Sequence, residues 1–408
     1  MTDFAEDEFA TPGNSKLPLR DWFLLPGLGL LTICCIAASA TAVARRIYPQ
    51  TRYFVDADMS PFDQSHPEAG SRAIPNSVFW EQRRDSQLVE FRINNCGHRT
   101  RLDCHSKPPG AYRIVLVGSS VPMGTGLPEN QTIASRLPED ISRLTGHTVE
   151  VYNEGMITME PEAVTLRFQE VLEPKPDMIV WLLTPYDIFT QPLPDPDIRI
   201  PPEKMGTLRK EWIRAQEAYK AGPFSGVAHH LNAQLLRTSL GVLLLHCLNE
   251  SLSQFLHSTL MGEDLKSDYL KVQPSAQWKL LLQEFDRDDA LIQERANAAN
   301  VPLVVVLVPN HVQAALISMG EWPDSLDPYK LGDEIRTIVT SHDGTFLDVS
   351  PYFHHLPNAE QYYFAVDGHP NAPGSAAISE MMAKELTGVK FSALAANRRS
   401  QFALEHGK

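Results

Sequence analysis

Short apolar runs that alternate with helical patterns constrain the fold of this chain more than any other feature of its sequence. The runs are rich in β-branched residues and lack the polar residue at every second position that a half-exposed strand would carry. Strands of this kind are buried on both faces, and intervening helices connect parallel neighbours. We therefore predict an α/β domain with one central parallel sheet of five strands. The predicted strands are Arg113–Val117, Val149–Asn153, Asp177–Thr184, Pro302–Val308 and Gly344–Val349.

The helical patterns lie between these strands and after the last of them. Residues 188–275 interrupt the alternation with a proline-rich loop and helical stretches, so we expect a helical insertion there. Its apolar segment Ser239–Leu248 is too short to cross a bilayer and is expected to pack over the core. The helices of the domain itself are expected near residues 130–144, 161–172, 277–300, 329–341 and 373–386.

The longest apolar run lies near the N-terminus. Trp22 to Ala44 carries no charged residue, and as a helix this run would extend about 34 Å, enough to cross the hydrocarbon layer of a membrane. We predict a membrane-spanning helix that is retained. A cleaved signal peptide is the alternative, because two small-residue triplets near the end of the run resemble processing sites. The acidic tail before the run and the length of the run favour the anchor.

The orientation of this anchor is left open by the charges that flank it. Two basic residues precede the run and three arginines follow it, so a cytoplasmic domain remains an alternative to an extracytoplasmic one. Cys96 and Cys104 could form a disulfide if their side of the membrane is oxidising, and two free thiols are the equal alternative.

Five segments divide the 408 residues. We expect an N-terminal tail (1–21), the membrane helix (22–44), a membrane-proximal segment rich in proline and arginine (45–111), the α/β domain with its insertion (112–390) and a C-terminal tail (391–408).

Composition excludes several classes of protein. With 43% hydrophobic and 21% charged residues the chain can bury a large core. Fifty acidic against 36 basic residues give a net charge of -14, which argues against nucleic-acid binding. The five cysteines show no metal-ligand spacing, so we predict no metal site and no cofactor. Asp286, Asp288 and Asp289, beside Arg287, are interpreted as a solvated helix face.

The candidate chemistry lies in four loops that follow the predicted strands or precede the last helix, where ligands of open parallel sheets bind. The loop at 118–124 (GSSVPMG) places a serine in a turn of small residues, near backbone N–H groups able to hold an oxyanion. The loop at 367–371 (DGHPN) places a carboxylate two residues from an imidazole, an arrangement that can support a general base. The other two loops are Asn153-Glu154-Gly155 and Thr184-Pro185-Tyr186-Asp187. Each loop by itself is more simply an ordinary turn or helix cap.

Taken together and in this order, the blocks GSSVPMG, NEG, TPYD and DGHPN resemble the SGNH (GDSL-like) hydrolase superfamily over residues 112–386. The element NNCGHR at 94–99, followed by PPGAYRIVLVGSS, also resembles the membrane-anchored bacterial members. The resemblance implies a three-layer sandwich of SGNH or flavodoxin-like type. It also implies a single-pass protein of the bacterial inner membrane with its main domain outside the cytoplasm.

The resemblance further implies a role for each residue of a catalytic triad. Ser120 matches the nucleophile of the family, His369 its general base, and Asp367 the carboxylate that orients the histidine. The imidazole would take the proton of the Ser120 hydroxyl as that oxygen attacks an ester carbonyl.

The oxyanion site that the resemblance implies draws on the backbone N–H groups of Ser120 and Gly155, with Asn153 beside them. The third block departs from the family, because it lacks the asparagine that is the third donor. Losing one such donor costs about 3 kcal/mol of transition-state stabilisation unless another group, here the Tyr186 hydroxyl, replaces it.

These features predict a membrane-anchored serine esterase or O-acyltransferase. The resemblance implies O-acetyl groups of envelope or secreted polysaccharide as the substrate. The expected partners are an acylated carbohydrate or another ester, membrane lipid around the N-terminal helix, and proteins of an envelope assembly, with no nucleic acid. The alternative is a catalytically silent SGNH-fold protein that binds glycan or partner proteins in a membrane assembly, which the presence of Tyr186 favours.

Overall fold

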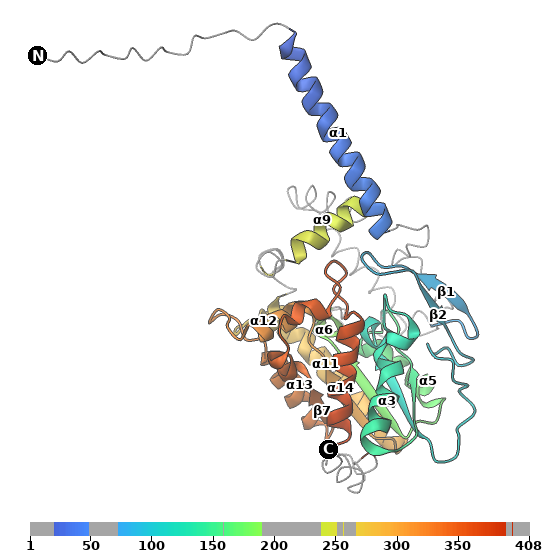
Figure 1. Ribbon diagram of the computed structural model, residues 1–408. Coiled ribbons are helices and arrows are strands. Elements are labelled where there is room, and N and C mark those ends of the chain that lie inside the picture. Colours follow the sequence, from blue (N-terminus) through green and yellow to red (C-terminus); the bar gives the residue numbers. More distant parts are fainter. Residues whose placement is uncertain are drawn as a thin grey trace, which may run out of the picture.

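The computed structural model describes residues 20–48, 72–157, 159–189, 238–250, 256, 267–388 and 394. Within them lies a body built on one large sheet, from which helix α1 (Asp21–Ile47) extends outward (Figure 1). The sheet has five parallel strands in the order β4-β3-β5-β6-β7, which confirms the predicted α/β architecture. These strands are β3 (Tyr112–Gly118), β4 (Val149–Asn153), β5 (Met178–Leu183), β6 (Leu303–Leu307) and β7 (Thr345–Asp348).

Successive residues of each strand enter two separate cores, one on each face of the sheet. Ile114 and Leu116 of β3 face one core, whereas Val115 and Val117 face the other. Helices close both cores, so the domain has the three layers that were predicted. The first core is covered by α3 (Ile133–Thr145) and α14 (Ala372–Leu386), and the second by α4 (Pro161–Leu166), α5 (Phe168–Leu172), α11 (Ala276–Ala298) and α13 (Lys330–Ser341).

Two helices differ from the sequence prediction. The single helix expected over 161–172 is interrupted at Arg167, whose buried guanidinium binds the carboxylate of Glu154 and ties the break to β4. Helix α12 (His311–Met319) was not indicated by the sequence, because most of its side chains are buried and no polar face marks the helical period. The 3-10 helices η1 (Glu129–Gln131), η3 (Asp268–Leu270) and η4 (Ser350–His355) lie in the connections.

The membrane-proximal segment contains secondary structure that the sequence did not indicate. Strands β1 (Val78–Glu81) and β2 (Val89–Arg92) form an antiparallel pair. The rings of Phe79 and Phe91 stack within it, and Phe91 is fully buried in the second core. The described part of this segment is therefore packed onto the α/β domain.

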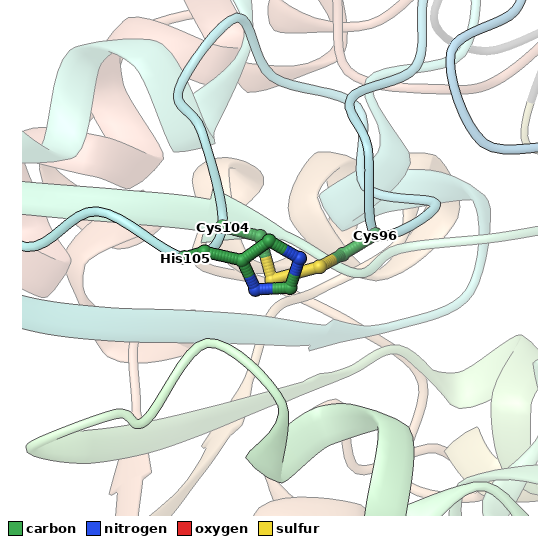
Figure 2. A group of neighbouring side chains, drawn as sticks. All are labelled: Cys96, Cys104 and His105. Carbon is green, nitrogen blue, oxygen red and sulfur yellow. A yellow bond between two sulfur atoms is a disulfide. The ribbon is translucent and has the colours of Figure 1, made fainter.

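A disulfide joins Cys96 and Cys104 in the loop after β2, beside the ring of His105 (Figure 2). The ligand atoms of these three residues lie within 4.8 Å of one another, which is close enough for one metal ion. Both sulfurs are committed to the disulfide, however, and only a thiolate binds a metal well. The group is therefore a structural crosslink, which resolves the alternative that the sequence left open.

Helix α1 has the length and composition of a membrane span. Within Trp22–Ile47, the most apolar window of 18 residues has a mean hydropathy of 2.1 and no buried residue. Figure 1 shows α9 (Ser239–Asn249), from the predicted insertion, beside the C-terminal end of α1. Much of that insertion lies outside the described residues, as do most of both predicted tails, so the proposed segment boundaries stay a prediction.

The acidic cluster of α11 corrects the sequence interpretation. Asp288 and Asp289 do not lie on a solvated face, because both side chains are buried against the sheet side of the helix. Burial raises the pKa of Asp288 to about 7, with the nearby carboxylates of Glu162 and Glu284 adding to the effect. Burial likewise raises the pKa of Asp289 to about 6. The charge of these side chains did not predict their exposure, because exposure depends on which elements pack against α11.

The raised pKa of Asp288 predicts that its own contribution to stability decreases as the pH rises. In the unfolded chain an aspartate gives up its proton near pH 4, whereas Asp288 in the folded chain does so at about 7. The contribution of Asp288 to stability should therefore fall from about pH 4 to about pH 7 and then level off. The variant Asp288→Asn, which mimics the protonated acid, should raise the melting temperature by a few degrees at about pH 8.

The same substitution should have little effect at about pH 3, where Asp288 is largely protonated in both states. Thermal melts of the two proteins across this pH range provide the measurement. A melting temperature that responds equally to the substitution at both pH values would contradict the assignment of a raised pKa.

Candidate active site

The turn after β3 positions a serine at the carboxyl edge of the sheet. Gly118 has φ +139°, and a Cβ there would overlap the carbonyl oxygen of Leu182 on β5, so the turn requires glycine. Ser120 begins the short helix α2 (Ser120–Met123), which ends at Gly124 in the left-handed region. The N–H groups in the first turn of a helix have no partner within it. The backbone N–H of Ser120 is therefore able to donate to a developing oxyanion.

A second loop, at residues 363–371, carries the histidine. It folds as a small hairpin in which Tyr363 pairs with Pro370 and the N–H of Phe364 donates to the carbonyl of His369 over 2.8 Å. Gly368 closes the turn at φ +85°. Asn371 then caps α14 by accepting the N–H of Gly374 over 3.0 Å. This hairpin follows the 3-10 helix η5 (Ala359–Tyr362) and projects the imidazole toward the serine.

The two loops bring the three predicted triad residues together. Nε2 of His369 lies 2.7 Å from Oγ of Ser120, although the two residues are 249 positions apart in the chain. Nδ1 of the same ring is hydrogen-bonded to Oδ1 of Asp367. With the Nδ1 proton donated to the carboxylate, Nε2 is free to accept the hydroxyl proton of the serine. This is the geometry that a nucleophile, a general base and an orienting carboxylate would require.

The charge state of Asp367 suits this role. Burial by itself raises the pKa of this carboxyl, but the charge of His369 and its hydrogen bond lower it, and Arg83 and Arg84 add to that effect. The net result is a pKa of about 2. Asp367 is therefore ionised at neutral pH and can hold the imidazole in one tautomer and orientation.

The loop after β4 packs against the serine helix. A Cβ on Gly155 would overlap the backbone of Met123, so this close approach requires glycine. The N–H of Gly155 donates to Oδ1 of Asn153 over 2.9 Å, and Nδ2 of Asn153 lies 3.4 Å from the carbonyl of Met123. Asn153 and Gly155 thus lie beside α2 as expected. Their part in an oxyanion site stays a prediction, in which the Gly155 N–H would have to turn from Asn153 toward the substrate.

The loop after β5 is tied to the serine turn through Asp187. This buried carboxylate accepts hydrogen bonds from the N–H and the hydroxyl of Thr184, over 2.6 and 2.7 Å, and from the hydroxyl of Ser119. Burial nevertheless raises the pKa of Asp187. Tyr186, in helix α6 (Pro185–Phe189), is 46% exposed at the same edge of the sheet. Its role as an oxyanion donor stays a prediction.

Residues of the NNCGHR element contact the end of α2 and the loop after β4. The buried guanidinium of Arg99 donates to the carbonyls of Met123, Gly124 and Leu127 over 2.6 to 2.7 Å, which fixes the C-terminal end of α2. Nε2 of His98, next to it, contacts the buried carboxylate of Glu154. The sequence drew attention to this element by resemblance, and the contacts of Arg99 give it a physical role.

The carboxylate of Glu154 is held between the side chains of His98 and Arg167. Its Oε1 lies 2.8 Å from Nη2 of Arg167, and its Oε2 faces His98. Burial raises the pKa of this carboxyl, but the charges of His98 and Arg167 outweigh burial and lower it. This buried cluster fixes the residue that immediately precedes Gly155.

Asp85 is a residue of the site that sequence reasoning missed. Its side chain is 1% exposed, and its two carboxylate oxygens accept the N–H groups of Val366 and Asp367 over 2.8 and 3.0 Å. These two N–H groups lie in the turn that carries the triad carboxylate. No local pattern marks Asp85, because it follows two arginines in the weakly periodic membrane-proximal segment.

Comparison with known proteins gives similarity of fold only. No family model and no curated protein matches this chain. Similar solved structures include TesA, which is 11% identical with a TM-score of 0.37, over 69% of this chain and 99% of TesA. A lipase/acylhydrolase from Enterococcus faecalis is 14% identical with a TM-score of 0.37, over 68% and 96% of the two chains. A GDSL-like lipase from Bacteroides thetaiotaomicron is 11% identical with a TM-score of 0.31, over 67% and 87%. Likenesses this distant carry no argument about activity.

The contacts of Asp85 predict that it keeps the triad loop ordered. The variant Asp85→Ala removes a charged acceptor from the N–H groups of Val366 and Asp367, so these amides should exchange with solvent about ten- to a hundredfold faster. Hydrogen exchange of peptides that cover residues 364–369, followed by mass spectrometry, measures this. Glu90→Ala, at a more exposed acid on β2, is the matched control and should leave that exchange unchanged. Equal protection in both variants would contradict the role of Asp85.

Proposed function

We propose that this protein is a membrane-anchored serine esterase or O-acyltransferase of the SGNH type. The observation that carries the proposal is the 2.7 Å contact between Oγ of Ser120 and Nε2 of His369, with Asp367 on the other ring nitrogen. A serine capping a turn has no need of such partners, whereas a nucleophile needs a base within hydrogen-bonding distance and a group that orients that base.

The chemistry follows from these contacts. Oγ of Ser120 attacks the ester carbonyl carbon while Nε2 of His369 takes the hydroxyl proton, giving a tetrahedral oxyanion. That intermediate expels the alcohol, which receives the proton from Nε2, and the acyl group remains on Ser120. Water or a second alcohol then attacks the acyl carbon, with His369 again taking the proton and returning it to Ser120. Water gives hydrolysis and an alcohol gives acyl transfer.

The oxyanion in this mechanism is held by the N–H groups of Ser120 and Gly155, and the Tyr186 hydroxyl supplies the third donor. The first two groups lie on either side of the contact between α2 and the loop after β4. The exposure of Tyr186 supports its role, because the ring lies at the carboxyl edge of the sheet and is open to a ligand there.

The substrate class that we favour is an O-acetylated polysaccharide of the cell envelope or a secreted one. A cavity of about 590 Å³ lies against the hairpin that carries His369. Hydroxyl groups of a sugar would find many donors and acceptors in this cavity, which lies beside the hairpin and is not lined by Ser120 itself. The lining residues are mostly polar: Asp85, His246, Asn249, Glu250, His311, Glu360, Gln361, Tyr363, Phe364, Ala365 and Asn371.

We place the protein in the bacterial inner membrane, with α1 as a single span and the main domain on the extracytoplasmic side. The apolar surface of α1 supports the span. The disulfide between Cys96 and Cys104 supports the orientation, because disulfides persist in oxidising compartments and are rare in the cytosol.

A fluorophosphonate probe tests the nucleophile directly, since it phosphonylates an activated serine. The full-length protein in detergent should be labelled on Ser120, and both Ser120→Ala and His369→Ala should abolish the label. The same two substitutions should lower the turnover of a p-nitrophenyl acetate substrate by roughly ten-thousandfold or more. Undiminished labelling of Ser120→Ala would exclude Ser120 as the reactive group.

The second candidate function is a catalytically silent protein that binds glycan or partner proteins in a membrane assembly. Two observations favour it: Tyr186 occupies the position of an expected asparagine, and the Gly155 N–H already donates to Asn153. A wild-type protein that is neither labelled by the probe nor faster than its Ser120→Ala variant would establish this alternative.

Tyr186 provides a separate prediction about the oxyanion site. Removing only its hydroxyl, in Tyr186→Phe, should lower kcat about a hundredfold and leave KM within about twofold, because the hydroxyl acts on the transition state. Steady-state kinetics on p-nitrophenyl acetate measure both constants. An unchanged kcat would show that the hydroxyl is not the third donor.

A further inference from the structure

Helix α9 is the second strongly apolar helix among the described residues, and it lies directly against the first. It packs on the C-terminal end of α1, where Ala44 is fully buried and the rings of Tyr48 and His246 approach to 5.6 Å. Figure 1 shows one end of α9 beside the lower part of α1 and the rest of α9 over the α/β body. At about 1.5 Å per residue, its 11 residues are far too short to cross a bilayer.

One face of α9 presents apolar side chains to the outside. Leu244 and Leu248 are 49% and 52% exposed, and Cys247 is exposed between them. The spacing i, i+3 and i+4 places these three side chains on one side of the helix. Val242, on the opposite side of the helix, is fully buried. We call Leu244, Cys247 and Leu248 the α9 stripe.

The position of α1 indicates what covers the α9 stripe. The exposed apolar side chains of α1 continue to its C-terminal end, at Val43 and Ile47, and require a hydrocarbon surrounding. Arg45 and Arg46 in the last turn mark the depth of the lipid headgroups, where basic side chains extend toward phosphate. Since α9 packs on this same end of α1, it lies at that depth too. An apolar stripe at the boundary of headgroups and acyl chains is the property of an interfacial helix.

We propose that α9 lies in the membrane–water interface with the α9 stripe inserted among the lipids of the bilayer that α1 crosses. The protein then contacts the membrane twice, through a spanning helix and through an interfacial one. Two contacts fix the tilt of the α/β body, whereas a single span followed by a loose segment would leave the body free to rotate.

The other side of α9 reaches the loop that carries the triad. Nδ2 of Asn249 donates to the carbonyl of Ala365 over 2.7 Å. His246 lies 3.7 Å from the Asp85 carboxylate, which in turn accepts the N–H groups of Val366 and Asp367. The interfacial helix is thus one hydrogen bond away from the turn before His369. If the proposed activity holds, on which this step rests, the enzyme acts on esters that are presented at the membrane surface.

A spin label on the native Cys247 tests the location of the stripe and requires no activity. The variant Cys34→Ser/Cys35→Ser leaves Cys247 as the free cysteine among the described residues. It is labelled with a nitroxide and placed in nanodiscs of phosphatidylethanolamine and phosphatidylglycerol. We expect the label to collide with apolar oxygen several-fold more, relative to a water-soluble nickel chelate, than a control label at Leu280→Cys on α11, made with Cys247 also replaced by serine.

A Cys247 label as accessible to the nickel chelate as the control would overturn the proposal. So would a label shielded from both reagents, since that result means a second protein surface covers the stripe. A second variant, with Leu244→Asp and Leu248→Asp added, should shift the Cys247 label toward the aqueous reagent. A label that stays equally deep would show that α1 alone sets its depth and that the stripe does not insert. Loss of esterase activity, by contrast, would bear only on the proposed function.

Discussion

The hydrogen bond between Ser120 and His369 is the interaction on which the functional account depends, and the topology of the sheet makes it possible. Strand β3 lies inside the sheet, with β4 on one side and β5 on the other, so its carboxyl end is surrounded by the loops of its neighbours. The first of these loops presses against the serine helix at Gly155, and the second holds the serine turn through Asp187. The loops on both sides of β3 therefore hold the serine turn in place.

The membrane-proximal segment and the insertion contact the hairpin that carries Asp367 and His369. Asp85 holds the backbone of Val366 and Asp367, and Asn249 of α9 holds Ala365, so the histidine hairpin is braced from outside the α/β core. The contact between Ser120 and His369 thus combines a serine positioned by the sheet with a histidine loop positioned by Asp85 and by α9. The buried, ionised state of Asp367 belongs to this second half, because His369, Arg83 and Arg84 maintain it.

The sequence predicted those features that depend on local pattern. Apolar runs identified the five strands, and the serine turn and the DGHPN loop identified the residues that meet at Ser120. What it could not predict depends on contacts between distant segments. No motif surrounds Asp85, and its role follows only from its contact with the backbone at residue 366. The acids of α11 form a charged cluster typical of a solvated face, and their burial follows only from the packing of the helix. The proposed role of α9 likewise follows from its packing on α1, because the sequence of α9 alone indicates only a short apolar helix.

A crystal structure of the full-length protein after reaction with a fluorophosphonate tests the central claim most directly. The account predicts a covalent bond between phosphorus and Oγ of Ser120, with a phosphonyl oxygen within hydrogen-bonding distance of the N–H groups of Ser120 and Gly155 and with His369 still paired to Asp367. Phosphorus bound to a different residue, or an unmodified Ser120 after prolonged exposure to the reagent, would contradict it.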